Sequence, residues 1–190
     1  MKRFVFLLFF AVFAVHTLMY GQNVAVKNNL LYDLTLTPNL SVEVGLAPKF
    51  TMDLQTGLNL FTLGDNKKLK HYLIQPELRY WFCERFNGLF VGAHAHGGQF
   101  NVGGFKLPFG WIPDMENHSY EGWFIGGGAS LGYQWILGNH WNLEASAGVG
   151  YARITYDKYH CANCGTLVKS DKLNYLGVTK AAISLIYIIK

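Results

Sequence analysis

The sequence predicts an all-β fold, an eight-stranded antiparallel up-and-down transmembrane β-barrel. Three observations lead to this prediction: apolar and polar residues alternate along most of the chain, the connections between the alternating segments are short and long in turn, and charge is scarce. Charged residues are 15% of the 190 residues and aromatic residues 16%, whereas soluble domains carry about 25% charged residues. Mean hydropathy is only +0.13, as expected for strands that turn one face to lipid and the other to a polar lumen.

The N-terminus is typical of a secretory signal peptide. A basic start at Lys2 and Arg3 precedes an unbroken apolar run over residues 4–15, and the segment ends at the small residue Gly21. This run is shorter than the roughly 20 residues of a spanning helix, which favours cleavage over a single anchoring helix. We therefore expect residues 1–21 to be a signal peptide and residues 22–190 to form an outer-membrane β-barrel domain.

Alternation with a period of two predicts eight strands, because successive side chains of a strand point to opposite faces. In the clearest example, Met52 and Leu54 share one parity, and Asp53 and Gln55 share the other. In chain order, the expected strands are Val24–Leu31, Leu40–Ala47, Phe50–Leu60, His71–Cys83, Gly88–Asn101, Tyr120–Ile136, Trp141–Thr155 and Asn174–Lys190.

The connections between these strands alternate in length. An even number of strands with short turns at one end and long loops at the other is the outer-membrane arrangement, with both termini on the periplasmic side. The short turns are Pro48–Lys49, Glu84–Asn87 and Leu137–His140, and the long loops are Tyr32–Asn39, Phe61–Lys70, Val102–Ser119 and Tyr156–Leu173.

Aromatic residues recur on the apolar parity at the spacing of two membrane interfaces. Trp123 and Tyr133 are ten residues apart, as are Trp141 and Tyr151. At about 3.3 Å per residue and a tilt near 40°, ten residues climb roughly 25 Å, the height of the apolar band between aromatic girdles. The residues assigned to the two girdles are Tyr72, Phe82, Trp123, Tyr133, Trp135, Trp141, Tyr151 and Tyr187.

Charged residues between the girdles fall on the opposite, polar parity, which predicts a polar network inside the barrel. Its expected members are Glu43, Asp53, Gln75, Glu77, Arg79, His94, His96, Glu144 and Lys180. His94 and His96 could hold a metal together with a carboxylate across the lumen, but two His at strand spacing form a weak motif, and a structural network is favoured. We therefore assign no metal, cofactor or catalytic residue, and an eight-stranded lumen is too narrow for a diffusion pore.

One alternative fold and one local irregularity follow from the same pattern. A soluble lipocalin-like barrel also has eight alternating strands but turns its apolar face inward around a ligand. Its outer surface would then consist of Gly, Ser and Gln, which is too poor in charge for water. Pro76 lies inside a predicted strand, where it cannot donate a ladder hydrogen bond, and it predicts a bulge.

Several motifs resemble the family catalogued as domain of unknown function three-five-seven-five. They are Lys27-Asn28-Asn29-Leu30-Leu31-Tyr32-Asp33, Leu36-Thr37-Pro38-Asn39-Leu40-Ser41-Val42-Glu43, Cys161-Ala162-Asn163-Cys164-Gly165 and Gly177-Val178-Thr179-Lys180-Ala181. The resemblance implies a small Gram-negative outer-membrane barrel, often encoded near fimbrial or surface-polysaccharide functions, with no agreed activity. The run from Lys180 to Tyr187 resembles the signal by which barrel-assembly machinery recognises a last strand, although Ala182 stands where that signal has Gly.

Cys161 and Cys164 lie close together in the last long loop. An exported protein meets oxidising conditions, so this pair predicts a disulfide. Reduced thiols or a zinc or redox site that includes His160 are the alternatives, but a closed structural zinc site wants four ligands. Cys83 is then left unpaired.

The predicted function is that of a non-enzymatic surface protein, either structural or involved in recognition, adhesion or fimbria association. Phe105, Phe109 and Trp111 in the longest loop are the candidate binding surface, since surface aromatics commonly anchor partners; a lid over the barrel mouth is the alternative. The expected partners are outer-membrane lipid, barrel-assembly machinery and a surface or fimbrial protein, with no nucleic acid, because the chain has no basic block. The second hypothesis is a membrane-embedded lipid hydrolase using Ser119 and His118 near Glu121.

Overall fold

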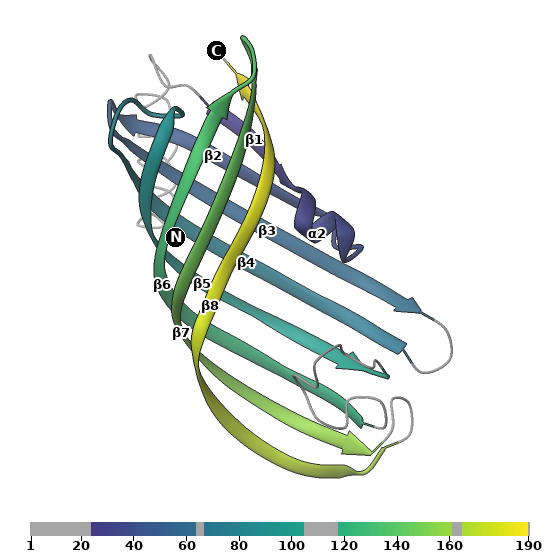
Figure 1. Ribbon diagram of the computed structural model, residues 1–190. Coiled ribbons are helices and arrows are strands. Elements are labelled where there is room, and N and C mark those ends of the chain that lie inside the picture. Colours follow the sequence, from purple (N-terminus) through teal and green to yellow (C-terminus); the bar gives the residue numbers. More distant parts are fainter. Residues whose placement is uncertain (1–23, 64–66, 105–117, 161–164, 190) are drawn as a thin grey trace, which may run out of the picture.

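Eight antiparallel strands form a closed barrel in which each strand pairs with its neighbour in sequence and β8 returns to pair with β1 (Figure 1). The computed structural model describes residues 24–63, 67–104, 118–160 and 165–189. The predicted all-β, eight-stranded antiparallel up-and-down barrel is confirmed. The strands are β1 (Val24–Asn29), β2 (Asn39–Ala47), β3 (Phe50–Leu63), β4 (Lys67–Trp81), β5 (Gly88–Gly103), β6 (His118–Ile136), β7 (Trp141–His160) and β8 (Leu167–Ile189), with one short helix, α2 (Leu30–Leu34). Within the described ranges, no helix has both the length and the hydropathy to cross a membrane.

The two parities of the sequence become the two faces of the wall. On β6, Leu131 is 55% exposed on the outside while Gln134 is 1% exposed in the interior. All eight residues assigned to the aromatic girdles lie on the exposed outer face. The lipocalin-like alternative is therefore wrong, because apolar side chains point outward and polar side chains fill the interior.

The first strand is shorter than predicted, because the side chain of Asn29 ends it. Asn29 Oδ1 accepts a hydrogen bond from the backbone N–H of Leu31 at 3.1 Å and caps α2. The Asn39 amide bonds both to the backbone N–H of Asn29, at 2.6 Å, and to its carbonyl, at 3.0 Å. It thereby joins the end of β1 to the start of β2 in place of a backbone pair. The first predicted loop is in this way tied to the wall.

The segment after α2 folds over the interior of the barrel. Thr37 is buried there, and Asn59 Nδ2 on β3 donates to the carbonyl of Leu36 at 3.1 Å. Gly57 of β3 leaves room for the Tyr32 ring, since a Cβ at that position would lie 3.3 Å from it. This connection therefore covers part of the interior at the end of the barrel that carries the long loops.

The last two strands reach further than the alternation indicated. β7 continues to His160 and β8 begins at Leu167, whereas the prediction ended and began these strands at Thr155 and Asn174. Ser170 donates to Asp157 at 2.6 Å across this extension. Polar residues occupy both faces here, so the two-faced pattern disappears although the pairing continues.

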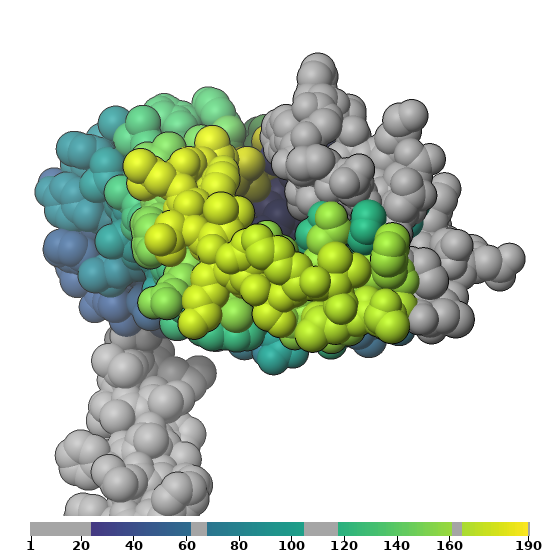
Figure 2. Space-filling view, turned by 90° about the horizontal axis from the view of Figure 1, so that it is seen from below, coloured from purple at the N-terminus to yellow at the C-terminus, as the bar shows by residue number. Residues whose placement is uncertain are grey.

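β1 pairs with β8 only from Ser184 to Ile189. Figure 2 shows a hollow beside the yellow atoms of β8, with purple N-terminal atoms at its bottom.

A bulge in β8 corrects one predicted facing. The register between β7 and β8 shifts between Gly148 and Val149, which pair with Lys180 and Val178 and leave Thr179 as the extra residue. The Thr179 hydroxyl lies 2.9 Å from His94 Nε2 in the interior. Thr179 has the parity of Ala181 and Ile183, so alternation predicts that it faces outward with them. That facing is wrong, because the bulge turns the successive side chains of Thr179 and Lys180 inward.

No bulge occurs at Pro76, contrary to the prediction. Pro76 pairs with Leu54 of β3 in an unbroken register. On the other side, β4 pairs with β5 up to Ile74 and again from Glu77, in the same register. The ladder is interrupted beside Pro76, which has no N–H to donate, and this interruption accommodates proline without an extra residue.

An apolar cluster closes the interior at the end that carries the short turns. Ala25, Phe86, Ile186 and Ile188 are buried together, and the ring of Trp81 lies 6.2 Å from that of Phe86. Ile186 and Ile188 appear irregular in the alternation of β8 because they belong to this cluster. The polar interior therefore lies between an apolar floor and the long-loop end.

Candidate functional site

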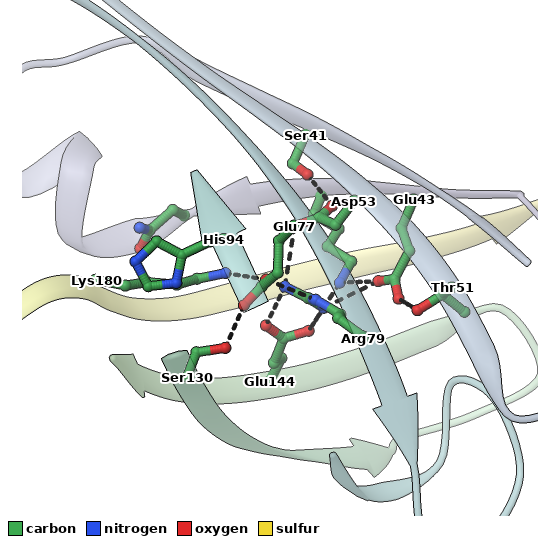
Figure 3. Close-up of polar contacts among 12 residues, drawn as sticks. Ser41, Glu43, Thr51, Asp53, Glu77, Arg79, His94, Ser130, Glu144 and Lys180 are labelled. Carbon is green, nitrogen blue, oxygen red and sulfur yellow. Dashed lines mark hydrogen bonds and ion pairs between the residues drawn. The ribbon is translucent and has the colours of Figure 1, made fainter. Parts of the chain in front are cut away.

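The interior of the barrel holds a network of charges centred on Arg79 of β4, shown in Figure 3. The Arg79 guanidinium contacts four carboxylates: Glu43 at 3.0 Å, Asp53 at 2.9 Å, Glu77 at 2.8 Å and Glu144 at 2.8 Å. These residues come from β2, β3, β4 and β7, and all are buried. One side chain thus ties together four of the eight strands.

Two lysines also pair with these carboxylates, so that the network holds three cations and four carboxylates. Lys27 of β1 pairs with Glu43 and lies 2.8 Å from Glu144, and Lys180 of β8 pairs with Glu77. Lys27 was not assigned to the network from the sequence, although it shares the parity of Ala25 and Asn29 inside a predicted strand. This shared parity is the sequence signal that could have placed Lys27 in the interior.

Hydroxyl and aromatic side chains make further hydrogen bonds and contacts with the charged groups of the network. Thr51 donates to Glu43, Ser41 to Asp53 and Ser130 to Glu77. The indole N–H of Trp81 donates to Thr51 at 2.9 Å, and the Arg79 guanidinium lies 4.5 Å from the centre of the Phe90 ring. Buried charges that are paired and hydrogen-bonded in this way are the arrangement a folded interior tolerates.

The network fills the interior at its own level. A cavity of about 10 Å³ lies beside Arg79, Glu144 and Lys180, which is room for about one water molecule. The close packing extends to Gly92, where a Cβ would lie 2.5 Å from Glu77 Oε1. The expectation that this lumen is too narrow for a diffusion pore agrees with this packing.

The two histidines lie just beyond the network. Their rings are 5.7 Å apart, and the Nδ1 atoms of both have no hydrogen-bond partner in the described part of the chain. Glu77 pairs with His94 across the β4–β5 ladder, but its carboxylate is held by Arg79, Lys180 and Ser130. No cluster of three potential metal ligands occurs in the four described ranges.

Gln75 is buried and pairs with Gln55 across the β3–β4 ladder. Its amide nitrogen makes no hydrogen bond to the described residues. The structure thus brings all nine predicted interior residues to the inside of the barrel, with the four carboxylates, Arg79 and Lys180 in direct contact and the others around them.

Of the remaining predicted residues, some lie within the described ranges and some do not. Cys161, Cys164, Phe105, Phe109 and Trp111 lie outside the described residues. Cys83 is an exposed free thiol.

The residues of the hydrolase hypothesis occupy the start of β6. Ser119 is buried, and His118 stacks on the His160 ring at 5.0 Å. Because His118 and Ser119 are successive strand residues, their side chains leave the strand on opposite faces. This placement gives no support to proton transfer between them.

Comparison with known proteins identifies the family. No curated protein matched the chain. A family model described as "Protein of unknown function (DUF3575)" matches residues 6–189. The motifs that carried the resemblance now have structural roles: Asn29 and Asn39 join β1, α2 and β2, and Lys180 pairs with Glu77. The match covers almost the whole chain, so this eight-stranded barrel belongs to the DUF3575 family.

Proposed function

We propose that this chain is a non-enzymatic outer-membrane β-barrel that presents its long-loop end at the cell surface as a structural or recognition element. The observation that carries the proposal is the inverted distribution of polarity: buried charge inside, exposed apolar and aromatic side chains outside. A water-soluble barrel of this kind would expose a large apolar surface, whereas lipid is the natural solvent for it.

The outer wall suits a bilayer in detail. Between the levels of Trp123 and Tyr133 on β6, the outward residues are apolar or Gly, and Leu131 lies within this belt, two residues from Tyr133. A Lys or Arg at the lipid midplane costs about 2–4 kcal/mol. The absence of charge from this stretch of the outer face of β6 is therefore what insertion requires.

The interior favours a function at the surface over transport. The Arg79 network and the apolar cluster at the short-turn end occupy the lumen, and its charges are engaged in ion pairs. Recognition then falls to the long-loop end, where we propose Phe105, Phe109 and Trp111 as the contact residues. A surface or fimbrial protein is the proposed partner class.

The proposed route to this location is export through a cleaved signal peptide, residues 1–21, into a Gram-negative outer membrane. Barrel-assembly machinery is the proposed partner for insertion, through the run from Lys180 to Tyr187. Outer-membrane lipid is then the permanent partner of the outer wall.

The membrane part of the proposal is tested with the mature chain, residues 22–190, refolded in the presence of lipid vesicles. We expect the protein to float with the vesicles in a density gradient at high salt and to give no steady conductance in a planar bilayer. A mature chain that stays soluble and monomeric without detergent would refute membrane insertion. Steady conductance would refute the claim that side chains fill the lumen.

The recognition part is tested on intact cells by proximity labelling from the long-loop end. A Phe105→Ala/Phe109→Ala/Trp111→Ala variant should lose labelled surface proteins that the wild type labels. Phe61→Ala is the matched control, since Phe61 is an exposed aromatic residue close to the long-loop end of β3. Equal labelling by all three proteins would count against the loop. A changed acylation pattern of outer-membrane lipid in Ser119→Ala cells would instead favour the hydrolase hypothesis.

A further inference from the structure

The outer wall carries a groove at the level of the long-loop aromatic girdle. It has a volume of about 370 Å³, and it crosses the strands from β3 to β7. Its lining includes two rows of outward side chains that lie at matching register positions on neighbouring strands. The row nearer the apolar belt is Leu58, Tyr72, Gln99 and Trp123, and the row beyond it is Leu60, Lys70, Asn101, Glu121 and Asp157.

The two rows have different chemistry. The first offers two aromatic faces, Tyr72 and Trp123, on either side of the Gln99 amide. β5 lies between their strands, so the aromatic positions are about 10 Å apart, room for two sugar rings. The second row offers hydrogen-bonding groups, and it lies on the side away from the belt. A ligand that fits both rows has an apolar tail and a polar head.

The charges of the second row decide what kind of head group fits. Glu121 and Asp157 lie directly opposite each other on β6 and β7, so the two carboxylates repel each other and favour a donor group between them. Asn101 donates to Glu121 at 3.2 Å, and Ser170 donates to Asp157 at 2.6 Å. Each carboxylate keeps further acceptor capacity toward the groove. A phosphate would meet two carboxylates and one ammonium, whereas sugar hydroxyls donate to the carboxylates and stack their C–H faces on the aromatic rings.

We propose that this groove binds the sugar head group of a glycolipid in the surrounding outer leaflet. Tyr72 and Trp123 stack on the sugar, Glu121 and Asp157 accept its hydroxyls, and Lys70 and Gln99 donate to its oxygens. The acyl chains run down the apolar wall below Leu58. The inference rests on the proposed membrane location, because only there does the groove face lipid.

The test uses two probes with the same alkyl chain, dodecyl maltoside and dodecylphosphocholine. The folded protein, kept in a polyoxyethylene detergent, is mixed with the two probes at equal concentration. Bound probe is then measured by native mass spectrometry. We expect about tenfold more bound maltoside than phosphocholine, equivalent to about 1.4 kcal/mol, and no displacement by free maltose at the same concentration. Equal retention of the two probes would overturn the proposal, and displacement by free maltose would assign the groove to soluble sugar instead.

Variants locate the binding. Trp123→Leu/Glu121→Ala should abolish the preference, whereas Trp135→Leu/Glu84→Ala removes the same residue types near the short-turn end and should keep it. If the first variant does not fold, Gln99→Leu decides, with an expected loss of about threefold; unchanged binding by either folded groove variant would refute the assignment. Wild-type protein that floats with vesicles but shows no head-group preference refutes the groove alone. Wild-type protein that fails to float refutes the membrane location.

Discussion

Replacing Arg79 with Met removes the centre of the buried network. The change leaves Asp53 with the Ser41 hydroxyl and Glu144 with Lys27 as their remaining partners in contact. Three cations and four carboxylates become two cations and four carboxylates in a buried interior. Breaking a buried pair by removing one partner costs about 3–5 kcal/mol, so we expect the free energy of unfolding to fall by that amount at neutral pH. Because Met can keep an apolar contact with Phe90, the loss of stability measures the removal of the charge.

The assay is guanidinium unfolding of the barrel in lipid vesicles, followed by tryptophan fluorescence and by the mobility difference between folded and unfolded protein in a gel. Arg153→Met is the matched control, because Arg153 is exposed on the outer face of β7; its stability should change by less than about 0.5 kcal/mol. Arg79→Met/Glu144→Gln removes one stranded carboxylate and should regain about 1–2 kcal/mol of the loss.

The pH dependence separates charge from packing. Carboxylates stranded by Arg79→Met are stabilised by protonation, so the difference in stability between wild type and variant should shrink as the pH falls below about 4.5. A deficit that stays constant with pH would assign the effect to packing. An Arg79→Met protein as stable as Arg153→Met at neutral pH would refute the network as a source of stability.

Three further predictions concern the wall, a close contact and the cysteines. Leu131→Arg should lower the yield of folding into vesicles, at a cost between the about 0–1 kcal/mol of an interface and the about 2–4 kcal/mol of the midplane. Gln134→Arg should be better tolerated, because Gln134 lies in the interior across the ladder from Glu144; equal yields would contradict the facing of β6. Gly92→Ala should destabilise the barrel by about 1–3 kcal/mol, because its Cβ would lie 2.5 Å from Glu77 Oε1, whereas Gly138→Ala meets nothing within 4 Å and should be neutral in the same unfolding assay. Alkylation without reduction should label one cysteine by intact mass, the exposed Cys83; three labels would exclude a disulfide between Cys161 and Cys164.

Much of the barrel could be predicted from alternation, because the outer face and the interior of the wall carry side chains of opposite polarity at successive residues. The nine interior residues and the eight girdle residues were assigned on that basis alone. The prediction fails where only one environment is present. Beyond Thr155 and before Asn174 both faces of the hairpin carry polar residues, so a pattern with a period of two could not reveal the extra strand length.

Local backbone devices were the other source of error. Leu30, Leu31 and Tyr32 continue the apolar character of β1, and what turns them into a helix is a set of side-chain bonds from Asn29 and Asn39. Thr179 faces inward because of a single extra residue in β8. Pro76 produced no bulge, since the neighbouring ladder is simply interrupted there. None of these effects changes the hydropathy pattern from which the strands were predicted.

The unequal length of the strands determines where the wall yields. β1 has 6 residues and β8 has 23. The barrel is therefore closed by a short ladder, in which Val24–Asn29 pairs with Ser184–Ile189. Strands β2 to β8 remain paired with each other when the β1–β8 ladder opens. Amide hydrogens of β1 should therefore exchange with solvent before those of β6 and β7, and tension on the N-terminus should peel β1 away as a unit while the other strands stay in register.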